Sequence, residues 1–483
     1  MKEALLEHVR DAVIRLVKDV GAGDPPAFTL EVPRNPDHGD FACNAAMMLT
    51  KRLRRPPREI AQELIEAIGD AGGLVSRAEI AGPGFVNLWL SASRWQGLLR
   101  QILEAGADYG RADVGAGRKV QIEFVSANPT GPLTLGHGRQ AVLGDSLARI
   151  LTAQGFDVTR EYYFNNGGRQ MRVLGQSVQA RYLERLGRAA PPPADALADA
   201  DLPWPERVDG LPVRFPRDGY QGDYIADIAE RIEAEHGDGW ADDADEERFR
   251  AVAEKAIFAE IRDTLDRIGI AFDVFYNEKS LYDEGKLDEV VADLRAQDLI
   301  YDADGAVWLR STTFGLDRDR VVIKSSGEPT YLLPDVAYHR EKFRRGFEVV
   351  IDCQGADHIE QFPYVVKAAG ALGCPEDAIE LVMNQFVTLT SGGEQLKQST
   401  RKANYVTVDE LADEVGVDVF RFFMVQRKAE GHLDFDLDLA KDTDWKKNPA
   451  YYLQYAYART HGIERKAAET GVAMPEPGQV DAT

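Results

Sequence analysis

Cysteines and long apolar runs are both scarce in this sequence of 483 residues, and each scarcity excludes a class of protein. The three cysteines, Cys43, Cys353 and Cys374, lie far apart and match no zinc-binding spacing, which argues against a disulfide framework and a cysteine-based metal site. No apolar run approaches the roughly 20 residues that a membrane-spanning helix needs, so we expect no membrane protein. The opening segment carries Glu3 and Glu7 among its apolar residues and matches neither a signal peptide nor a transit peptide. We therefore expect a cytoplasmic protein.

Positive charge is also in deficit, because 57 lysines and arginines face 80 aspartates and glutamates and give a net charge of −23. This balance argues against a protein that coats nucleic acid with its whole surface, but not against one local basic face. The densest positive run is residues 51–58, in which Arg52, Arg54 and Arg55 are candidate contacts for an RNA phosphate backbone. The alternative is a solvent-exposed helix end and turn that binds nothing.

The first part of the chain, residues 1–112, has the pattern of an α+β domain. Apolar residues recur at helical spacing in residues 5–20 and 60–68, and the second of these segments follows a pair of prolines. Residues 79–88 alternate as strands do on either side of a glycine–proline turn.

Residues 113–405 have the pattern of a doubly wound, parallel, Rossmann-like sheet. Residues 119–124 alternate as a strand, and a loop and a helix follow, which is the first half of a βαβ unit. Ligands of such sheets bind at the carboxyl ends of the strands. Residues 188–245 are rich in Ala, Pro and Asp and are predicted to be an insertion. Residues 406–483 are predicted to be a helical bundle, with a tyrosine-rich stretch that includes Tyr455.

The most specific motif is residues 132–139, Pro-Leu-Thr-Leu-Gly-His-Gly-Arg, where a strand leads into a helix. Gly136 and Gly138 let a ligand approach the backbone, and the helix start offers N–H groups and a positive dipole end that favour phosphate. His137 can donate a hydrogen bond to phosphoryl oxygens as negative charge develops on them. The alternative is an ordinary glycine-rich helix start with a lone histidine.

Residues 125–139 closely resemble the nucleotide-binding motif of class I aminoacyl-tRNA synthetases, and in particular the arginyl-tRNA synthetase version. Residues 38–42 and 81–85 resemble the amino-terminal domain of the same family. Residues 329–339 and 354–358 are similar to its catalytic core. A Lys-Gln-Ser-Thr-Arg-Lys segment that starts at Lys397 falls where the family has its mobile lysine–serine loop. The resemblance spans nearly the whole chain, with the motifs in the family's order.

The resemblance implies an arginine–tRNA ligase, which joins L-arginine to ATP, releases pyrophosphate and passes the arginyl group to the terminal adenosine of tRNA(Arg). The arginine carboxylate is already ionised, so activation needs no general base and depends on positioning and on stabilising charge at the phosphates. The implied catalytic residues are His137, Thr134 and Lys397, and Mg²⁺ is expected to arrive with ATP. The implied ATP-binding residues are Pro132, Gly136, His137, Gly138, His358, Lys397, Ser399 and Arg401.

Recognition of arginine requires carboxylates in a fixed geometry, because a guanidinium group is planar and always charged. Tyr331 and Asp335 are four residues apart, which places both on one face of a helical turn. By resemblance the arginine site comprises Glu123, Ser126, Asn128, Glu278, Tyr331, Asp335 and Gln354. The alternatives remain open: Glu123 as the polar face of a strand, Glu278 as an exposed loop acid, Asn128 as a turn residue and Tyr331 as core.

The implied tRNA contacts are Arg52, Arg54, Arg55 and Tyr455, and we expect a monomer. The chain departs from the family at Thr134, which replaces the first histidine of a His-x-Gly-His pattern, and at Thr400, which replaces a lysine. We also expect only the opening helices of the family's anticodon-binding domain. These departures motivate an alternative, a non-catalytic RNA-binding paralogue of the same fold. A nucleotidyl transferase that uses a small acid and no RNA is a further alternative.

Overall fold

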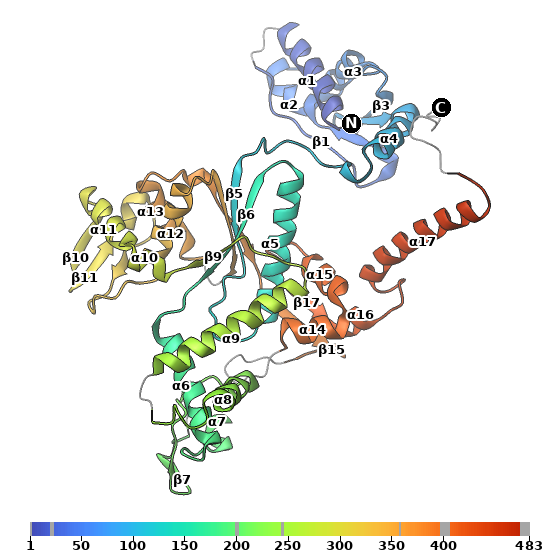
Figure 1. Cartoon of the computed structure of the whole chain (residues 1–483). Coiled ribbons are helices and arrows are strands. Elements are labelled where there is room, and N and C mark those ends of the chain that lie inside the picture. The colour runs from blue at the N-terminus through green and yellow to red at the C-terminus, as the bar shows by residue number, and fades with distance from the viewer. Residues whose placement is uncertain are drawn as a thin grey trace. The chain divides into compact units, whose positions relative to one another are not determined.

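The computed structural model describes residues 2–19, 24–198, 202–242, 246–356, 359–396 and 406–473. The chain divides into two compact units (Figure 1), residues 1–110 with 462–483 and residues 111–461. Among the described residues, no helix has the length and apolar character that crossing a membrane requires.

The first unit is an α+β domain, as the sequence predicts. Its antiparallel sheet has the order β1 (Leu30–Glu31), β2 (Phe41–Cys43), β4 (Phe85–Leu90) and β3 (Val75–Ala81). The sheet shares one apolar core with α1 (Lys2–Asp19), α2 (Ala45–Leu53) and α3 (Pro57–Ile68). The predicted glycine–proline turn joins β3 to β4, and α4 (Ala92–Ala105) follows with no buried residue.

The second unit is built on a parallel sheet of five strands. In space their order is β14 (Ile379–Asn384), β13 (Val349–Gly355), β5 (Lys119–Glu123), β6 (Asp157–Phe164) and β9 (Val274–Asn277). Strand β5, the first of these five in chain order, is therefore central, with β6 and β9 on one side of it and β13 and β14 on the other. This confirms the predicted doubly wound sheet, and the strand order reverses between β5 and β13, where such folds bind ligands.

Helix α5 (Leu135–Ala153) follows β5 and packs closely on it, because a Cβ at Gly144 would overlap the ring of Phe124. Arg139 of α5 is fully buried and donates hydrogen bonds to the backbone oxygens of Gln385, Lys428 and Gly431, at 2.7, 2.9 and 2.9 Å. The start of α5 is thereby fixed to the segments that follow β14 and α15 (Val417–Val425).

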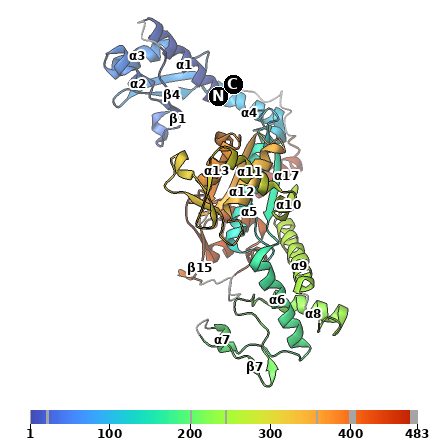
Figure 2. The same ribbon diagram turned by 90° about the vertical axis from the view of Figure 1, so that its left-hand side faces the viewer.

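The predicted insertion, residues 188–245, contains regular structure. Its helix α8 (Asp223–His236) lies beside α6 (Gly168–Arg185) and α9 (Glu246–Arg267), which flank the insertion in the chain (Figures 1 and 2). The isoleucines of α8 at positions 225, 228 and 232 are buried, which explains why this segment folds as a helix despite its polar composition. A short helix α7 (Ala194–Ala198) and a hairpin of β7 (Arg207–Val208) and β8 (Leu211–Pro212) precede α8.

A smaller subdomain lies between β9 and β13 and has its own apolar core. It begins with α10 (Lys279–Asp283) and α11 (Lys286–Ala296). An antiparallel sheet of β10 (Ile300–Ala303), β11 (Ala306–Leu309) and β12 (Arg320–Ile323) follows, and α12 (Leu332–Arg344) leads back to β13. Helix α13 (Phe362–Ala371), which follows β13, packs against α12.

The last part of the chain is mostly helical, as predicted, with α14 (Val408–Val415), α15, α16 (Leu437–Lys441) and α17 (Pro449–Glu469). The prediction that this part of the chain contains only helices is wrong, because residues Leu433–Asp436 form strand β17. This strand pairs in parallel with β15 (Val387–Ser391), and β16 (Glu394–Gln395) pairs with the other side of β15. The reason is local, since Leu433 and Phe435 are buried while Asp434 and Asp436 are exposed, which is strand alternation.

Candidate active site

A pocket of about 400 Å³ opens where the strand order of the large sheet reverses. All the residues predicted to contact arginine line it: Glu123, Ser126, Asn128, Glu278, Tyr331, Asp335 and Gln354. They come from the end of β5 and the loop after it, the start of α10, the start of α12 and the end of β13. Segments that are far apart in sequence therefore meet at one place in the fold, the carboxyl edge of the sheet.

The turn after β5 has an unusual backbone. Val125 and Ser126 have φ angles of 67° and 43°, in the left-handed region that a β-branched residue such as valine rarely adopts. The Ser126 hydroxyl donates to Glu123 Oε1 at 2.9 Å and accepts from the backbone N–H of Tyr163 at 3.2 Å. Backbone strain of this kind concentrates at ligand sites, where surrounding contacts hold it in place.

Asn128 is held by β6 and by the segment that follows it. Its Oδ1 accepts from the backbone N–H of Asn165 at 3.0 Å, and its Nδ2 donates to Gln170 Oε1 at 3.1 Å. The preceding carbonyl, that of Ala127, accepts from the Tyr162 hydroxyl at 2.7 Å. Asn128 therefore has a fixed orientation in the wall of the pocket.

Glu278 is buried, with 7% of its surface exposed, so the alternative of an exposed loop acid is wrong. Its carboxylate accepts from the Tyr163 hydroxyl and from Asn165 Nδ2, both at 2.8 Å, and from the Tyr282 hydroxyl at 3.2 Å. Burial raises the pKa of Glu278, and the three hydrogen bonds only partly offset this. A cation bound next to Glu278 would therefore stabilise the charged form of its carboxylate.

Asp335 lies in the first turn of α12, and Tyr331 immediately precedes that helix, as the spacing predicts. Gln361 Nε2 donates to Asp335 Oδ2 at 2.7 Å. Burial raises the pKa of Asp335 to about 7, with Glu123 and Glu278 adding to the shift against the opposing effect of His339. Tyr331 is 78% exposed, so the alternative that it belongs to the core is wrong.

Glu123 belongs to a buried charge network and is not the exposed polar face of a strand. Lys342 Nζ donates to Glu123 Oε2 at 2.7 Å and to Asp352 Oδ1 at 2.6 Å. His339 contacts the other oxygen of Asp352 through Nε2 at 2.7 Å and the Asp335 carbonyl through Nδ1 at 2.8 Å. Burial raises the pKa of Glu123 against the effect of Lys342. For Asp352, burial is outweighed by Lys342 and His339, and its pKa is lowered.

The start of α5 carries the predicted phosphate-binding residues. The backbone N–H of Thr134 donates to His137 Nδ1 at 3.2 Å, and the Thr134 hydroxyl lies 3.3 Å from the same nitrogen. Burial lowers the pKa of His137 to about 4, so the ring is neutral at pH 7 and carries its proton on Nε2. That N–H is the hydrogen-bond donor which the ring can offer to a ligand.

The two glycines of this motif differ. Gly136 is exposed at the helix start, where a ligand can approach the backbone. Gly138 is buried, and a Cβ there would lie 2.9 Å from Phe420 of α15 and 3.0 Å from Val408 of α14. Glycine at position 138 is thus required by helix packing, whatever it contributes to ATP binding. Pro132 lies in the loop before α5, and His358, Lys397, Ser399 and Arg401 lie outside the described residues, as does Thr400.

The side chains of the predicted tRNA contacts differ in their exposure and in the partners that they already have within the chain. Arg52 and Arg54 are exposed at the end of α2 and make no ion pair among the described residues. Arg55 instead donates to both oxygens of Glu63 at 2.8 and 2.7 Å, so part of its charge is already neutralised. Tyr455 of α17 stacks on Trp445 with 4.4 Å between ring centres.

Sequence reasoning missed several residues that build the pocket: Gln140, Tyr163, Asn165, His339, Lys342 and Gln361. When the amide oxygen and nitrogen of Gln140 are assigned to satisfy its hydrogen bonds, the nitrogen donates to the Val125 carbonyl at 3.1 Å. The oxygen then accepts from the Gly355 N–H at 3.0 Å. Tyr163 and Asn165 had a signal in the sequence, because they stand at the carboxyl end of a strand in a predicted parallel sheet. Lys342 had none, since a lysine late in an amphipathic helix is typical of an exposed face.

Comparisons with known proteins agree with this geometry. The family described as "Arginyl tRNA synthetase N terminal domain" matches residues 3–90, and "tRNA synthetases class I (R), catalytic domain" matches residues 98–193 and 240–428. The gap between the last two ranges coincides with the predicted insertion.

Curated relatives cover most of the chain. The arginine–tRNA ligase of Desulfotalea psychrophila is 50% identical over 460 residues, which are 95% of this chain and 78% of that relative. The arginine–tRNA ligase of Geobacillus thermodenitrificans is 45% identical over 472 residues, 97% of this chain and 80% of that relative. The solved structure of Thermus thermophilus arginyl-tRNA synthetase shares the fold, with a TM-score of 0.70 and 22% identity over 99% of this chain and 84% of that one. On these matches, the chain belongs to the arginyl-tRNA synthetase family of class I aminoacyl-tRNA synthetases.

Proposed function

We propose that the protein activates L-arginine with ATP and transfers the arginyl group to tRNA(Arg). The observation that carries the proposal is the pocket at the carboxyl end of β5, which combines buried carboxylates with a phosphate-binding helix start nearby in the sequence. The relatives named as ligases favour this interpretation over the alternative of a non-catalytic RNA-binding paralogue.

Arginine enters the pocket with its guanidinium group toward Asp335 and Tyr331, and Glu278 supplies a second carboxylate. Both acids have a raised pKa, because burial disfavours their charged forms. A permanent cation beside these acids favours their ionised forms. Binding of the guanidinium group is therefore driven by its electrostatic attraction to the two carboxylates. An uncharged side chain of similar length does not provide this relief, which is the physical basis of selectivity.

The other end of arginine is held near the strained turn after β5. Ser126 and Asn128 offer polar atoms to the α-amino group, and Gln354, at the end of β13, offers an amide to the carboxylate. Glu123 orders this region through its contacts with Ser126 and Lys342. The rigid backbone of the sheet thus sets the direction in which the carboxylate points.

In the first step the ionised carboxylate attacks the α-phosphorus of ATP, a carboxylate oxygen–phosphorus bond forms, and the bond to pyrophosphate breaks. The free N–H groups at the start of α5 and the Nε2–H of His137 donate to phosphate oxygens as charge shifts onto them. Thr134 fixes the tautomer of His137 by donating its backbone N–H to Nδ1. Lys397, Ser399, Arg401 and His358 complete the proposed ATP site, with Pro132, Gly136 and Gly138 in its wall.

Mg²⁺ is proposed to arrive with ATP, since the described residues offer no cluster of three or more acidic, histidine or cysteine ligands for it. When bound, it would offset charge on the phosphates. The chain's own residues supply the remaining positioning.

In the second step a hydroxyl of the terminal tRNA ribose attacks the arginyl carbonyl carbon, and AMP leaves. We propose that residues 1–112 contact the tRNA through Arg52, Arg54 and Arg55, that residues 113–405 carry the chemistry and that the helices of 406–483, with Tyr455, contribute a further contact. A monomer is sufficient for this scheme, because every proposed substrate contact comes from one chain.

Arginine-dependent exchange between ATP and pyrophosphate tests the proposal. We expect exchange that requires arginine and increases when tRNA(Arg) is added, followed by formation of arginyl-tRNA. Lysine and citrulline serve as controls, since one has a different cation and the other lacks the charge. Absence of exchange both with and without tRNA would support the RNA-binding paralogue instead.

A further inference from the structure

The β5–α5 loop, residues 124–134, joins the two halves of the proposed active site. Asn128 in this loop lines the arginine pocket, and Thr134, its last residue, orients His137 at the start of α5. Asn128 is fixed by the segment after β6, and the other end of the loop is hydrogen-bonded to the start of α14. The spacing between the two halves therefore depends on the stretch between these anchors, residues 129–132.

The middle of this loop is held by the insertion, residues 188–245. The hydroxyl of Tyr224, in the first turn of α8, donates to the Thr130 carbonyl at 2.8 Å. Tyr220, four residues earlier, contacts the same residue: burial raises the pKa of Tyr220, and a hydrogen bond from the Thr130 side chain partly offsets this shift. Two tyrosines of one segment therefore converge on one residue of the loop.

The two tyrosines are themselves firmly held. Gly222 precedes α8, and a Cβ there would lie 2.3 Å from Cε1 of Tyr224, so the tyrosine ring occupies the space that a side chain at this position would fill. The backbone N–H of Tyr220 donates at 3.1 Å to the hydroxyl of Ser177, a buried residue of α6. The buried isoleucines of α8 share one apolar core with α6 and α9 (Figure 1). Because this core already holds the insertion in place, α8 does not need the contacts with Thr130 for its own packing.

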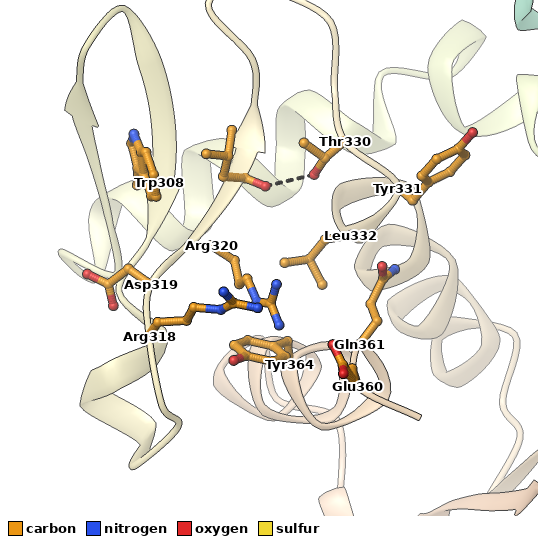
Figure 3. Close-up of a pocket in the computed structure, with 11 residues that line it drawn as sticks. Trp308, Arg318, Asp319, Arg320, Thr330, Tyr331, Leu332, Glu360, Gln361 and Tyr364 are labelled. Atoms are coloured by element: carbon orange, nitrogen blue, oxygen red, sulfur yellow. Dashed lines mark hydrogen bonds between the residues drawn. The ribbon is translucent and has the colours of Figure 1, made fainter. Parts of the chain in front are cut away.

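The tyrosines do not belong to either of the two larger pockets of the second unit. Thr130, Tyr220 and Tyr224 line neither the arginine pocket nor the pocket of about 650 Å³ on the subdomain between β9 and β13 (Figure 3). Their influence on the reaction must therefore pass through the β5–α5 loop.

Building on the proposed function, we propose that Tyr224 and Tyr220 are positioning residues for arginine activation. By holding Thr130 they set the spacing between Asn128, which orients arginine, and the start of α5, which binds the phosphates of ATP. Attack of the carboxylate on the α-phosphorus requires the reacting atoms to lie about 3–3.5 Å apart, and a misplacement of roughly 1 Å costs about 100-fold in rate. A loosened loop therefore lowers kcat, whereas arginine still binds through Asp335 and other residues outside the loop.

Removal of the two hydroxyl groups tests the proposal. Tyr224→Phe keeps the ring and removes the hydrogen bond to Thr130, and Y220F/Y224F removes both contacts. Tyr182→Phe is the matched control. The Tyr182 hydroxyl also donates to a backbone carbonyl, that of Gly237 at 2.7 Å, but at the opposite end of α8.

Two measurements distinguish the variants. In ATP–pyrophosphate exchange with tRNA(Arg) present, Tyr224→Phe should lower kcat about fivefold, the equivalent of one hydrogen bond, and change the KM for arginine by less than about twofold. Y220F/Y224F should lower kcat further. Hydrogen exchange followed by mass spectrometry should show faster exchange in residues 124–134 of both variants. Tyr182→Phe should change neither kcat nor the loop, although its urea unfolding midpoint should fall about as much as that of Tyr224→Phe.

An equal loss of kcat in Tyr224→Phe and Tyr182→Phe would overturn the proposal, because it would reflect lost stability in general. Faster exchange of the loop with an unchanged kcat would overturn it too, since the tyrosines would then hold the loop without serving the reaction. If the wild type shows no arginine-dependent exchange of ATP and pyrophosphate, the proposed function fails. Hydrogen exchange then decides on the tyrosine contacts alone, and an unchanged loop in Y220F/Y224F would refute them as well.

Discussion

The ammonium group of Lys342 lies 2.7 Å from Glu123 Oε2, and both side chains are buried, Lys342 completely. The same ammonium contacts Asp352, so this cation from α12 links the end of β5 to the middle of β13. Burial opposes the charge on Lys342, but Asp352 and Glu123 outweigh it and raise its pKa. The network therefore fixes the two strands whose ends form the arginine pocket.

Replacing Lys342 by Met should destabilise the protein strongly. The substitution leaves Glu123 and Asp352 buried without their shared cation, and breaking such a pair costs about 3–5 kcal/mol. Urea unfolding followed by circular dichroism measures the free energy of unfolding. Lys367→Met is the control, because Lys367 forms an ion pair with Glu376 at the surface and a change of roughly 0–1 kcal/mol is expected there. Equal effects of the two substitutions would contradict the role given to the network.

Asp335→Asn should weaken arginine binding far more than ATP binding. The substitution keeps the shape and the hydrogen bond with Gln361 within reach, but removes the charge that faces the guanidinium group. Losing one partner of a buried charged contact costs about 2–5 kcal/mol, or at least about 30-fold in the KM for arginine. Steady-state exchange kinetics give both KM values. Asp293→Asn is the control, since Asp293 pairs with Arg340 away from the pocket. A similar rise in both KM values would place Asp335 elsewhere in the mechanism.

Arginine binding should depend on pH around neutrality. Burial raises the pKa of Asp335 to about 7, so a fraction of this carboxyl is protonated at neutral pH before arginine binds. Only the ionised form attracts a guanidinium, so the KM for arginine rises as the pH falls below about 7, and binding at that pH releases a proton. Calorimetry in buffers of different ionisation enthalpy measures the release. Asp335→Asn should abolish it, and an unchanged proton release in that variant would assign the titration to another group.

The central part of the site could be predicted from the sequence because its residues lie in one continuous segment at the end of a single strand. The segment from Glu123 to His137 runs from β5 through its turn into α5, so a single stretch of chain contains the strand end, the strained loop and the helix start. Tyr331 and Asp335 were readable for a similar reason, since their spacing of four is a helical spacing. Local pattern and resemblance together were enough to name seven of the residues that line the pocket: Glu123, Ser126, Asn128, Glu278, Tyr331, Asp335 and Gln354.

The rest depends on contacts between distant segments, which no local pattern reveals. Gln361 contacts Asp335 only because α13 packs against α12, and Lys342 reaches Glu123 only because the fold brings α12 next to β5. The ion pair of Arg55 with Glu63 likewise joins the segment before α3 to the middle of that helix. The sequence shows these two parts only as a basic run and a helix that contains acidic residues. β17 was missed because a strand of four residues is too short to stand out from its helical neighbours.

Arg52 and Arg54 should matter more for tRNA than Arg55 does. The first two are exposed and unpaired among the described residues, whereas Arg55 shares its charge with Glu63 through two hydrogen bonds. R52E/R54E should raise the KM for tRNA(Arg) by about tenfold at low salt, and the effect should shrink as salt screens the phosphates. Single Arg55→Ala should have less effect on KM and should instead loosen the contact between the turn before α3 and the middle of that helix. Aminoacylation kinetics across a salt series measure both. A KM that is independent of salt in R52E/R54E would mean that residues 51–58 are only a solvated helix end.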